Sequence, residues 1–256
     1  MSRIVVCTGR GGTGKTTFVA LCARLLGHHP LLIDADSDQS LPEALGVDLS
    51  SRGLKTVSDI LYDIQRGTIA EDFKSMNLPD RIELLCNRSC LYESSAFDLM
   101  AIGVKWTRGC YCMPNNILRA IIPELASSYE YTLIDAPAGL EHLNRRIVSD
   151  IDDLFVIADP SSKALANIKR LREVSRQVGI VFKHLYLVGN YRFDASTESF
   201  LRDSGEHYVG RVAPDPNVAE YNLRGQALSD LPMDSDAVQS VRSILLSTGF
   251  PLENEG

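Results

Sequence analysis

Uninterrupted runs of apolar residues, separated by longer amphipathic segments, are the main feature of the hydrophobic pattern. Such runs, rich in Val, Ile and Leu, are typical of strands that are covered on both faces, as in parallel sheets. Strands are predicted at residues 3–7, 30–33, 131–135, 154–158, 185–188 and 208–212. Residues 81–85 alternate between polar and apolar side chains, and this alternation predicts one more strand.

Between these runs, apolar residues recur at helical spacing. Helices are predicted at residues 17–26, 116–127, 163–178, 218–223 and 236–246. Residues 41–70 are expected to be mostly helical and polar, and residues 94–113 to form a loop with short helical pieces. Strands that alternate with helices predict an α/β fold, with a mostly parallel twisted sheet flanked by helices. No linker, repeat or low-complexity tract interrupts the chain, so one domain spanning residues 1–256 is expected.

One short motif carries specific chemistry. Residues 9–16 read GRGGTGKT and match the P-loop pattern G-x-x-x-x-G-K-[ST], between a predicted strand and a predicted helix. Glycines let backbone N–H groups surround a phosphate chain, and the following helix N-terminus adds partial positive charge. Lys15 is expected to reach the β- and γ-phosphates, and Thr16 to bind Mg²⁺ through its hydroxyl. The predicted phosphate-binding residues are Gly11, Gly12, Thr13, Gly14, Lys15, Thr16 and Thr17.

Three acidic residues stand at the ends of predicted strands: Asp34 and Asp36 follow the strand at residues 30–33, and Asp135 ends the strand at residues 131–135. Ligands of open parallel sheets bind outside the carboxyl ends of the strands. Asp135 can therefore hold Mg²⁺ opposite Thr16. Asp34 and Asp36 would face the same phosphate chain, where carboxylates anchor the metal shell and orient an attacking water. Helix capping or turn formation is the alternative role for each acid.

The overall charge narrows the choice of partners. The 256 residues include 26 Lys and Arg against 33 Asp and Glu, a formal net charge of −7. This balance argues against non-specific nucleic-acid binding, which needs a basic surface, and we expect no nucleic-acid partner. No apolar stretch is long enough to span a bilayer, and the first predicted strand leaves no room for a signal peptide. We therefore expect a cytoplasmic protein without a membrane partner, whose six cysteines are reduced.

Cys110 and Cys112 are separated by a single residue and precede a predicted helix. Two thiolates at this spacing cannot easily close on each other, but they can share a soft metal if a second pair completes the shell. A two-fold dimer would supply that pair, giving four sulfurs. A tetrahedral arrangement would suit Zn²⁺ and a planar one Ni²⁺. An ordinary core or surface position is the alternative for both cysteines.

The P-loop and the paired acids resemble the deviant P-loop ATPases of the MinD/ParA type. In that family the second strand ends in D-x-D; the resemblance implies that Asp36 activates water and that Asp34 lies near the metal. It also implies that Asn190 reads the adenine edge, and that the loop containing Pro214 contacts adenine. The family has lysine where this chain has Arg10. That lysine reaches across a dimer to the partner's phosphates, and arginine keeps the charge; the alternative is a solvated side chain.

Two further segments resemble the CooC-type nickel-insertion ATPases, which serve carbon monoxide dehydrogenase. These are residues 110–118, CYCMPNNIL, and residues 138–145, AGLEHLNR. The resemblance implies a homodimer in which Cys110 and Cys112 of both subunits bind one Ni²⁺ or Zn²⁺ at the interface. It implies slow ATP hydrolysis linked to nickel delivery, with carbon monoxide dehydrogenase or its acetyl-CoA synthase partner as client.

Two other functions compete with nickel delivery. A MinD/ParA-type positioning ATPase that binds membrane needs a basic amphipathic C-terminal helix, whereas residues 249–256 are short and acidic. An electron-transfer ATPase similar to the nitrogenase iron protein would hold a [4Fe–4S] cluster, but those relatives space their cysteines far apart. Cys86 and Cys90 are expected to flank a turn and stay unassigned, and His142 either takes part in the nucleotide switch or packs.

Overall fold

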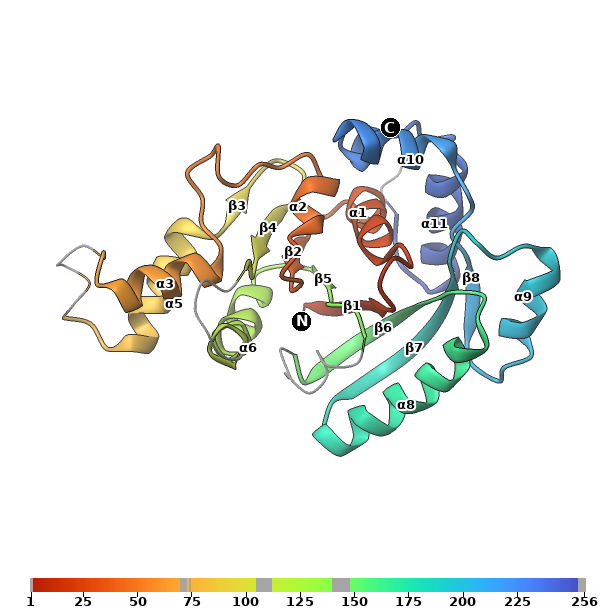
Figure 1. Ribbon diagram of the computed structural model, residues 1–256, viewed down its shortest axis with the longest axis horizontal. Helices are drawn as coiled ribbons and strands as arrows, with labels where there is room; N and C mark the ends of the chain where they lie inside the picture. The colour runs from red at the N-terminus through yellow and green to blue at the C-terminus, as the bar shows by residue number, and fades with distance from the viewer. Residues whose placement is uncertain (1, 70–72, 74, 105–111, 140–147, 253–256) are drawn as a thin grey trace.

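The computed structural model describes residues 2–69, 73, 75–104, 112–139 and 148–252. Within these ranges, eight strands form one sheet in the order β3-β4-β2-β5-β1-β6-β7-β8 (Figure 1). Every pairing is parallel except the one between β3 and β4. The strands are β1 (Arg3–Gly9), β2 (Leu31–Asp34), β3 (Tyr92–Glu93), β4 (Asp98–Ala101), β5 (Tyr131–Asp135), β6 (Asp150–Ala158), β7 (Val181–Gly189) and β8 (Tyr208–Arg211). The predicted α/β class and the mostly parallel sheet are confirmed.

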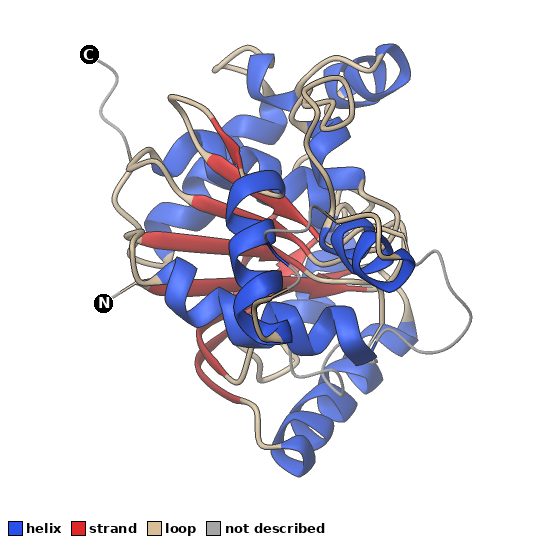
Figure 2. Cartoon of the chain, turned by 90° about the vertical axis from the view of Figure 1, so that its left-hand side faces the viewer, coloured by secondary structure: helices blue, strands red, loops and turns tan. Residues whose placement is uncertain are grey.

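Helices cover both faces of this sheet (Figure 2). One face packs against α1, α2 and α11, and the other against α3, α5, α6 and α8. Successive strand residues alternate between the two cores: Val5 and Cys7 face the first, and Val6 faces the second. The described helices are α1 (Lys15–Leu26), α2 (Ser40–Ala44), α3 (Val57–Arg66), α5 (Leu78–Ser89), α6 (Cys112–Ala126), α8 (Ser162–Val178), α9 (Ala195–Arg202), α10 (Pro216–Arg224), η1 (Leu228–Asp230) and α11 (Asp236–Ser247).

Two predicted elements are wrong. Residues 81–85 lie inside helix α5, not in a strand. Asn77 caps this helix by accepting from the backbone N–H of Asp80, and Ile82 and Cys86 are buried one turn apart on one face. The hydrophobic pattern of a five-residue run such as RIELL is compatible with both a strand and a helix. The helix cap, which lies outside the run, therefore determines the secondary structure.

The second error concerns residues 94–113, which contain the fully buried strand β4. β4 pairs with β2 in parallel and with β3 in antiparallel orientation. Its four residues, DLMA, are too few for a periodicity signal. Cys86 and Cys90 likewise do not flank a turn: they lie one helical turn apart at the end of α5, and both are fully buried.

The strand order brings the predicted acids together. β5 lies between β2 and β1, so the carboxyl ends of these three strands are neighbours. In this register Asp34 is directly beside Asp135, and Asp135 is directly beside Cys7, two residues before the P-loop. The phosphate loop and the acids therefore share one edge of the sheet.

Candidate nucleotide site

The P-loop connects β1 to α1 and has the backbone shape that glycine permits. Gly12 and Gly14 adopt φ values of 70° and 93°, in the left-handed region that side-chain-bearing residues avoid. Gly14 is also the N-cap of α1, and no side chain caps that helix start. The first N–H groups of α1 thus lack a side-chain acceptor, which is the arrangement that binds phosphate. Lys15 is buried and its Nζ donates to the carbonyl oxygen of Arg10 at 3.3 Å.

Thr16 and Asp135 meet at the same end of the sheet. The Thr16 hydroxyl donates to Oδ2 of Asp135 at 2.6 Å. The other oxygen, Oδ1, is buried and has no hydrogen-bond partner in the described part of the chain, and burial raises the pKa of this carboxyl to about 6. A buried carboxylate oxygen without a donor, beside a hydroxyl, is an oxygen-only donor set that suits Mg²⁺. These residues therefore fit the predicted metal.

Asp34 is fully buried and holds the following loop in place. Its two oxygens accept backbone N–H groups of Asp36 at 2.9 Å and of Leu41 at 3.0 Å. Burial, together with the negative charge of Asp135, raises the pKa of Asp34 to about 8. Asp36 is partly exposed, and its negative charge contributes to the raised pKa values of both Asp34 and Asp135.

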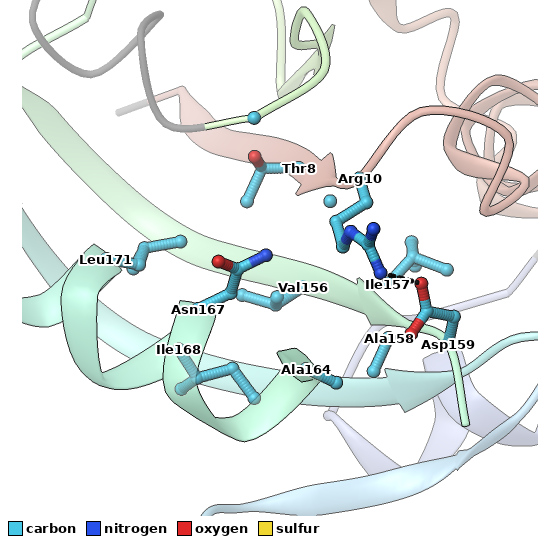
Figure 3. A pocket seen from close by; sticks show the side chains of 12 residues that line it. Thr8, Arg10, Val156, Ile157, Ala158, Asp159, Ala164, Asn167, Ile168 and Leu171 are labelled. Atoms are coloured by element: carbon cyan, nitrogen blue, oxygen red, sulfur yellow. Dashed lines mark hydrogen bonds and ion pairs between the residues drawn. The ribbon is translucent and has the colours of Figure 1, made fainter. Parts of the chain in front are cut away.

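Arg10 makes a contact that sequence reasoning missed. Its Nη1 donates to Oδ2 of Asp159 at 2.8 Å and to the Ser161 hydroxyl at 3.3 Å, within the same subunit (Figure 3). Asp159 directly follows β6, at the same sheet edge as the P-loop. The available signal was the position of Asp159 after a predicted strand, but nothing in the local pattern pairs it with residue 10. The guanidinium closes one end of a small cavity that Asn167 of α8 also lines.

A second cavity opens on the other side of the P-loop. It has a volume of ≈ 400 Å³, and Thr13, Thr17 and Pro214 line it. The structure thus places predicted residues from the P-loop and from the loop after β8 around one space, which is large enough for a nucleoside. Tyr191, which the sequence did not single out, also lines it.

Asn190 directly follows β7, and the next residue, Tyr191, lines this cavity. It is buried, its Oδ1 accepts the backbone N–H of Arg192 at 3.0 Å, and its Nδ2 has no hydrogen-bond partner among the described residues. An unpaired buried amide donor is costly unless a ligand satisfies it. Asn190 is not among the residues that line the cavity, so its predicted contact with adenine stays a prediction.

The predicted nickel or zinc ligands are Cys110 and Cys112. Cys110 and His142 lie outside the described residues, and Cys112 is the first residue of α6 with its side chain outside them. Cys7 and Cys22 are buried, as expected for core positions. Within the described part of the chain, no group of three or more His, Cys, Asp or Glu side chains is arranged to hold a metal. In the same part, no helix is both long and apolar enough to cross a bilayer.

Comparison with known proteins places this site in a family. Residues 1–184 match the family model described as "AAA domain". An uncharacterized ATP-binding protein of Methanocaldococcus jannaschii is 32% identical over 249 residues, which cover 94% of this chain and 96% of that protein. The septum site-determining protein MinD of Thermotoga maritima is 30% identical, and the similarity covers 98% of this chain and 90% of that protein. The carbon monoxide dehydrogenase accessory protein CooC of Rhodospirillum rubrum is 25% identical, with 97% and 98% covered.

Solved structures show the same fold. MinD of Pyrococcus horikoshii, complexed with Mg-ADP, superposes with a TM-score of 0.68 at 20% identity, covering 97% of this chain and 96% of that chain. A putative plasmid partition protein of Borrelia burgdorferi, bound to AMPPNP, gives a TM-score of 0.69 at 14% identity, covering 96% and 98%. The chain belongs to the AAA-domain family of P-loop ATPases, with the MinD/ParA-type fold.

Proposed function

We propose that this protein is an ATP-hydrolysing nickel chaperone for carbon monoxide dehydrogenase or its acetyl-CoA synthase partner. It works in the cytoplasm as a homodimer whose assembly depends on nucleotide and on metal. The observation that carries the ATP-dependent part is the convergence of Lys15, Thr16, Asp135, Asp34 and Asp36 at the adjoining ends of β1, β2 and β5.

Each of these residues has a separate role in the proposed hydrolysis of ATP. Lys15 and the N–H groups of the P-loop hold the β- and γ-phosphates. Thr16 and Asp135 would hold Mg²⁺, and the bound ion would neutralise charge that develops on the phosphate oxygens. Asp36 is partly exposed and orients the attacking water, whereas buried Asp34 holds the loop that carries Asp36 through its bond from the Asp36 N–H. Thr17 and Pro214 border the nucleoside cavity.

Support for nickel delivery comes from one relative and one motif. The relative CooC, by its name, is an accessory protein of carbon monoxide dehydrogenase, and the similarity extends over nearly the whole of both chains. Cys110 and Cys112 supply two thiolates per chain immediately before and at the start of α6. Soft-metal sites usually take four ligands, so two subunits are needed to complete one.

The test is activation of a client. Nickel-deficient carbon monoxide dehydrogenase is incubated with the protein, Ni²⁺ and MgATP, and carbon monoxide oxidation is measured against time. Activation should require ATP and should be lost in Lys15→Ala and in the Cys110→Ser/Cys112→Ser double variant. Equal activation by the double variant and the parent would reject nickel delivery through these cysteines, while leaving ATP hydrolysis intact.

A MinD/ParA-type positioning function is the second candidate, because the MinD protein of Thermotoga maritima is 30% identical to this chain. Such a protein would hydrolyse ATP and dimerise with nucleotide alone. ATP-dependent dimerisation that is unchanged in the double serine variant, together with no client activation, would favour this candidate.

A further inference from the structure

A polar cluster lies at the edge of the sheet opposite the P-loop, where β2 and β4 begin. Three segments meet there: the α1–β2 connection with His29, the turn between β3 and β4 with Ser94, and Tyr129 ahead of β5. The backbone N–H of Asp98, at the start of β4, donates to the carbonyl oxygen of Pro30 at 3.1 Å. This hydrogen bond joins the β3–β4 segment to the α1–β2 connection. None of these residues takes part in the nucleotide site.

Asp98 is the buried centre of this cluster, with a side chain only 8% exposed. Its Oδ2 accepts the hydroxyl of Tyr129 at 2.5 Å. Its Oδ1 is buried and has no hydrogen-bond partner among the described residues. A buried carboxylate oxygen without a donor is costly in the absence of a cation.

The neighbouring groups point at the unsatisfied oxygen. His29 Nε2 lies 3.5 Å from Oδ1 of Asp98 and 2.6 Å from the carbonyl oxygen of Ser94. The Ser94 hydroxyl fixes the turn by donating to the carbonyl of Phe97 and accepting from its N–H, so the Ser94 carbonyl is held toward the imidazole. The His29 ring stacks on Tyr129 with an interplanar angle of 9°.

Access and charge also favour a cation. The His29 side chain is 41% exposed, which leaves a route from solvent to the buried carboxylate. Glu93 stands directly opposite Asp98 in the antiparallel pair, on the same face of the hairpin, and adds negative charge.

We propose that His29 Nε2, Asp98 Oδ1 and the Ser94 carbonyl bind a borderline divalent cation, Zn²⁺ or Ni²⁺, with water completing the shell. Imidazole with carboxylate and carbonyl oxygen is a donor set for such ions. A tetrahedral ion with bonds of about 2.0 Å keeps its ligands about 3.3 Å apart, close to the Nε2–Oδ1 separation. When the ion binds, it replaces the proton on His29 Nε2, and that proton is released to solvent. The distance between His29 Nε2 and the Ser94 carbonyl oxygen then increases, because the ion lies between the two atoms. The Tyr129 hydroxyl then orients the ligating carboxylate.

This site is independent of the cysteine pair and of dimerisation. All three ligands come from one chain, so the stoichiometry is one ion per chain. The ion would tie the α1–β2 turn to the β3–β4 turn at the amino edge of the sheet.

The experiment uses tag-free, full-length protein carrying Cys110→Ser and Cys112→Ser, so that the proposed interface site cannot contribute. Zn²⁺ and Ni²⁺ are titrated by calorimetry, and Co²⁺ serves as an absorbing probe. We expect one ion per chain and a visible Co²⁺ spectrum without thiolate-to-cobalt charge transfer. Bound ion should raise the melting temperature, because it binds only the folded chain.

Three variants in the same background assign the ligands. His29→Ala should abolish binding, and Tyr129→Phe should weaken it about tenfold. His28→Ala is the matched control: the adjacent histidine pairs with Glu130 instead, so binding should persist. Asp98→Asn tests the carboxylate, and its melting curve without metal shows whether it folds. Absence of binding in the background protein, or unchanged binding in folded His29→Ala, overturns the proposal.

Discussion

Asp34 and Asp135 are two buried carboxylates in adjoining positions of β2 and β5, and each bears on how stability depends on pH. Their pKa values lie at about 8 and about 6, above the ordinary value of 3.8. The folded chain therefore holds protons that the unfolded chain has already released. The stability that these protons contribute is complete below about pH 4 and is lost as the pH rises through 6 and then 8.

We expect the free energy of unfolding of the metal-free protein to fall between pH 5 and pH 8.5. Denaturant titrations in EDTA at several pH values measure this slope. Asp34→Asn cannot titrate and keeps one acceptor oxygen, so its slope should be shallower. A parent stability that rises over this interval would contradict the raised pKa values.

A second prediction for single residues separates ATP binding from ATP hydrolysis. Lys15→Ala removes the ammonium that we propose contacts the phosphates, and it should lower ATP hydrolysis about a hundredfold or more. Asp36→Ala leaves the phosphate loop intact, so ATP should still bind while turnover slows. Nucleotide affinity and single-turnover rates are measured on both variants. Full turnover in Asp36→Ala would remove this residue from the chemistry.

At the level of elements, the loop after β4 fits closely against the start of α3. Gly103 adopts a φ of +74°, and a Cβ there would lie 2.1 Å from the Thr56 hydroxyl oxygen. Thr56 is the N-cap of α3 and forms a capping box with Asp59. Gly103→Ala should therefore strain the loop and displace the cap, with a loss of about 2–4 kcal/mol in unfolding free energy.

Gly53→Ala is the matched control for this change. Gly53 has a similar φ of +70°, but nothing lies within 4 Å of its added Cβ. It should lose only about 1 kcal/mol, from the backbone conformation alone. Chemical denaturation measures both variants, and equal losses would show that the contact with Thr56 is unimportant.

The contact between Arg10 and Asp159 joins the loops after β1 and β6. If Arg10 also reaches the partner's phosphates, as its family position implies, the ion pair with Asp159 competes with that role. A partly exposed ion pair is worth at most about 1 kcal/mol, so Asp159→Asn should speed ATP hydrolysis by no more than about fivefold. Mixed dimers of Arg10→Ala with Lys15→Ala should recover part of the activity. No recovery would confine Arg10 to its own subunit.

The elements differ in how well the sequence predicts them, for physical reasons. β1, β5 and β6 carry long apolar runs because both of their faces are covered. α5 and β4 were missed because a short run fits either period, and the deciding features, an N-cap and a strand pairing, lie outside it. In the site, strand ends predicted the three acids, but the Arg10–Asp159 contact spans 149 residues and depends on the fold.

At the level of the whole molecule, the cysteine pair makes a prediction about assembly. If Cys110 and Cys112 of two subunits share one ion, metal binds only the dimer and drives dimerisation without nucleotide. The protein is titrated with Ni²⁺ or Zn²⁺ under reducing conditions without nucleotide, and its mass is followed by light scattering. The mass should double when one ion has bound per two chains, not counting ions bound at a site within a single chain. The double serine variant should remain monomeric while still binding ATP. Doubling of mass in that variant would reject the shared site.

The position of β5 between β1 and β2 has a consequence for synthesis. The hydrogen bond from Thr16 to Asp135 links residues 119 positions apart, so more than half of the 256-residue chain must be synthesised before it can form. Until then the P-loop can exist, but the carboxylate that we propose as a metal ligand is missing and the central sheet lacks a strand. Long-range pairings of this kind slow folding and prolong the exposure of strand edges. A nascent chain of this protein can therefore complete the proposed magnesium site only after β5 has been synthesised and has paired between β1 and β2.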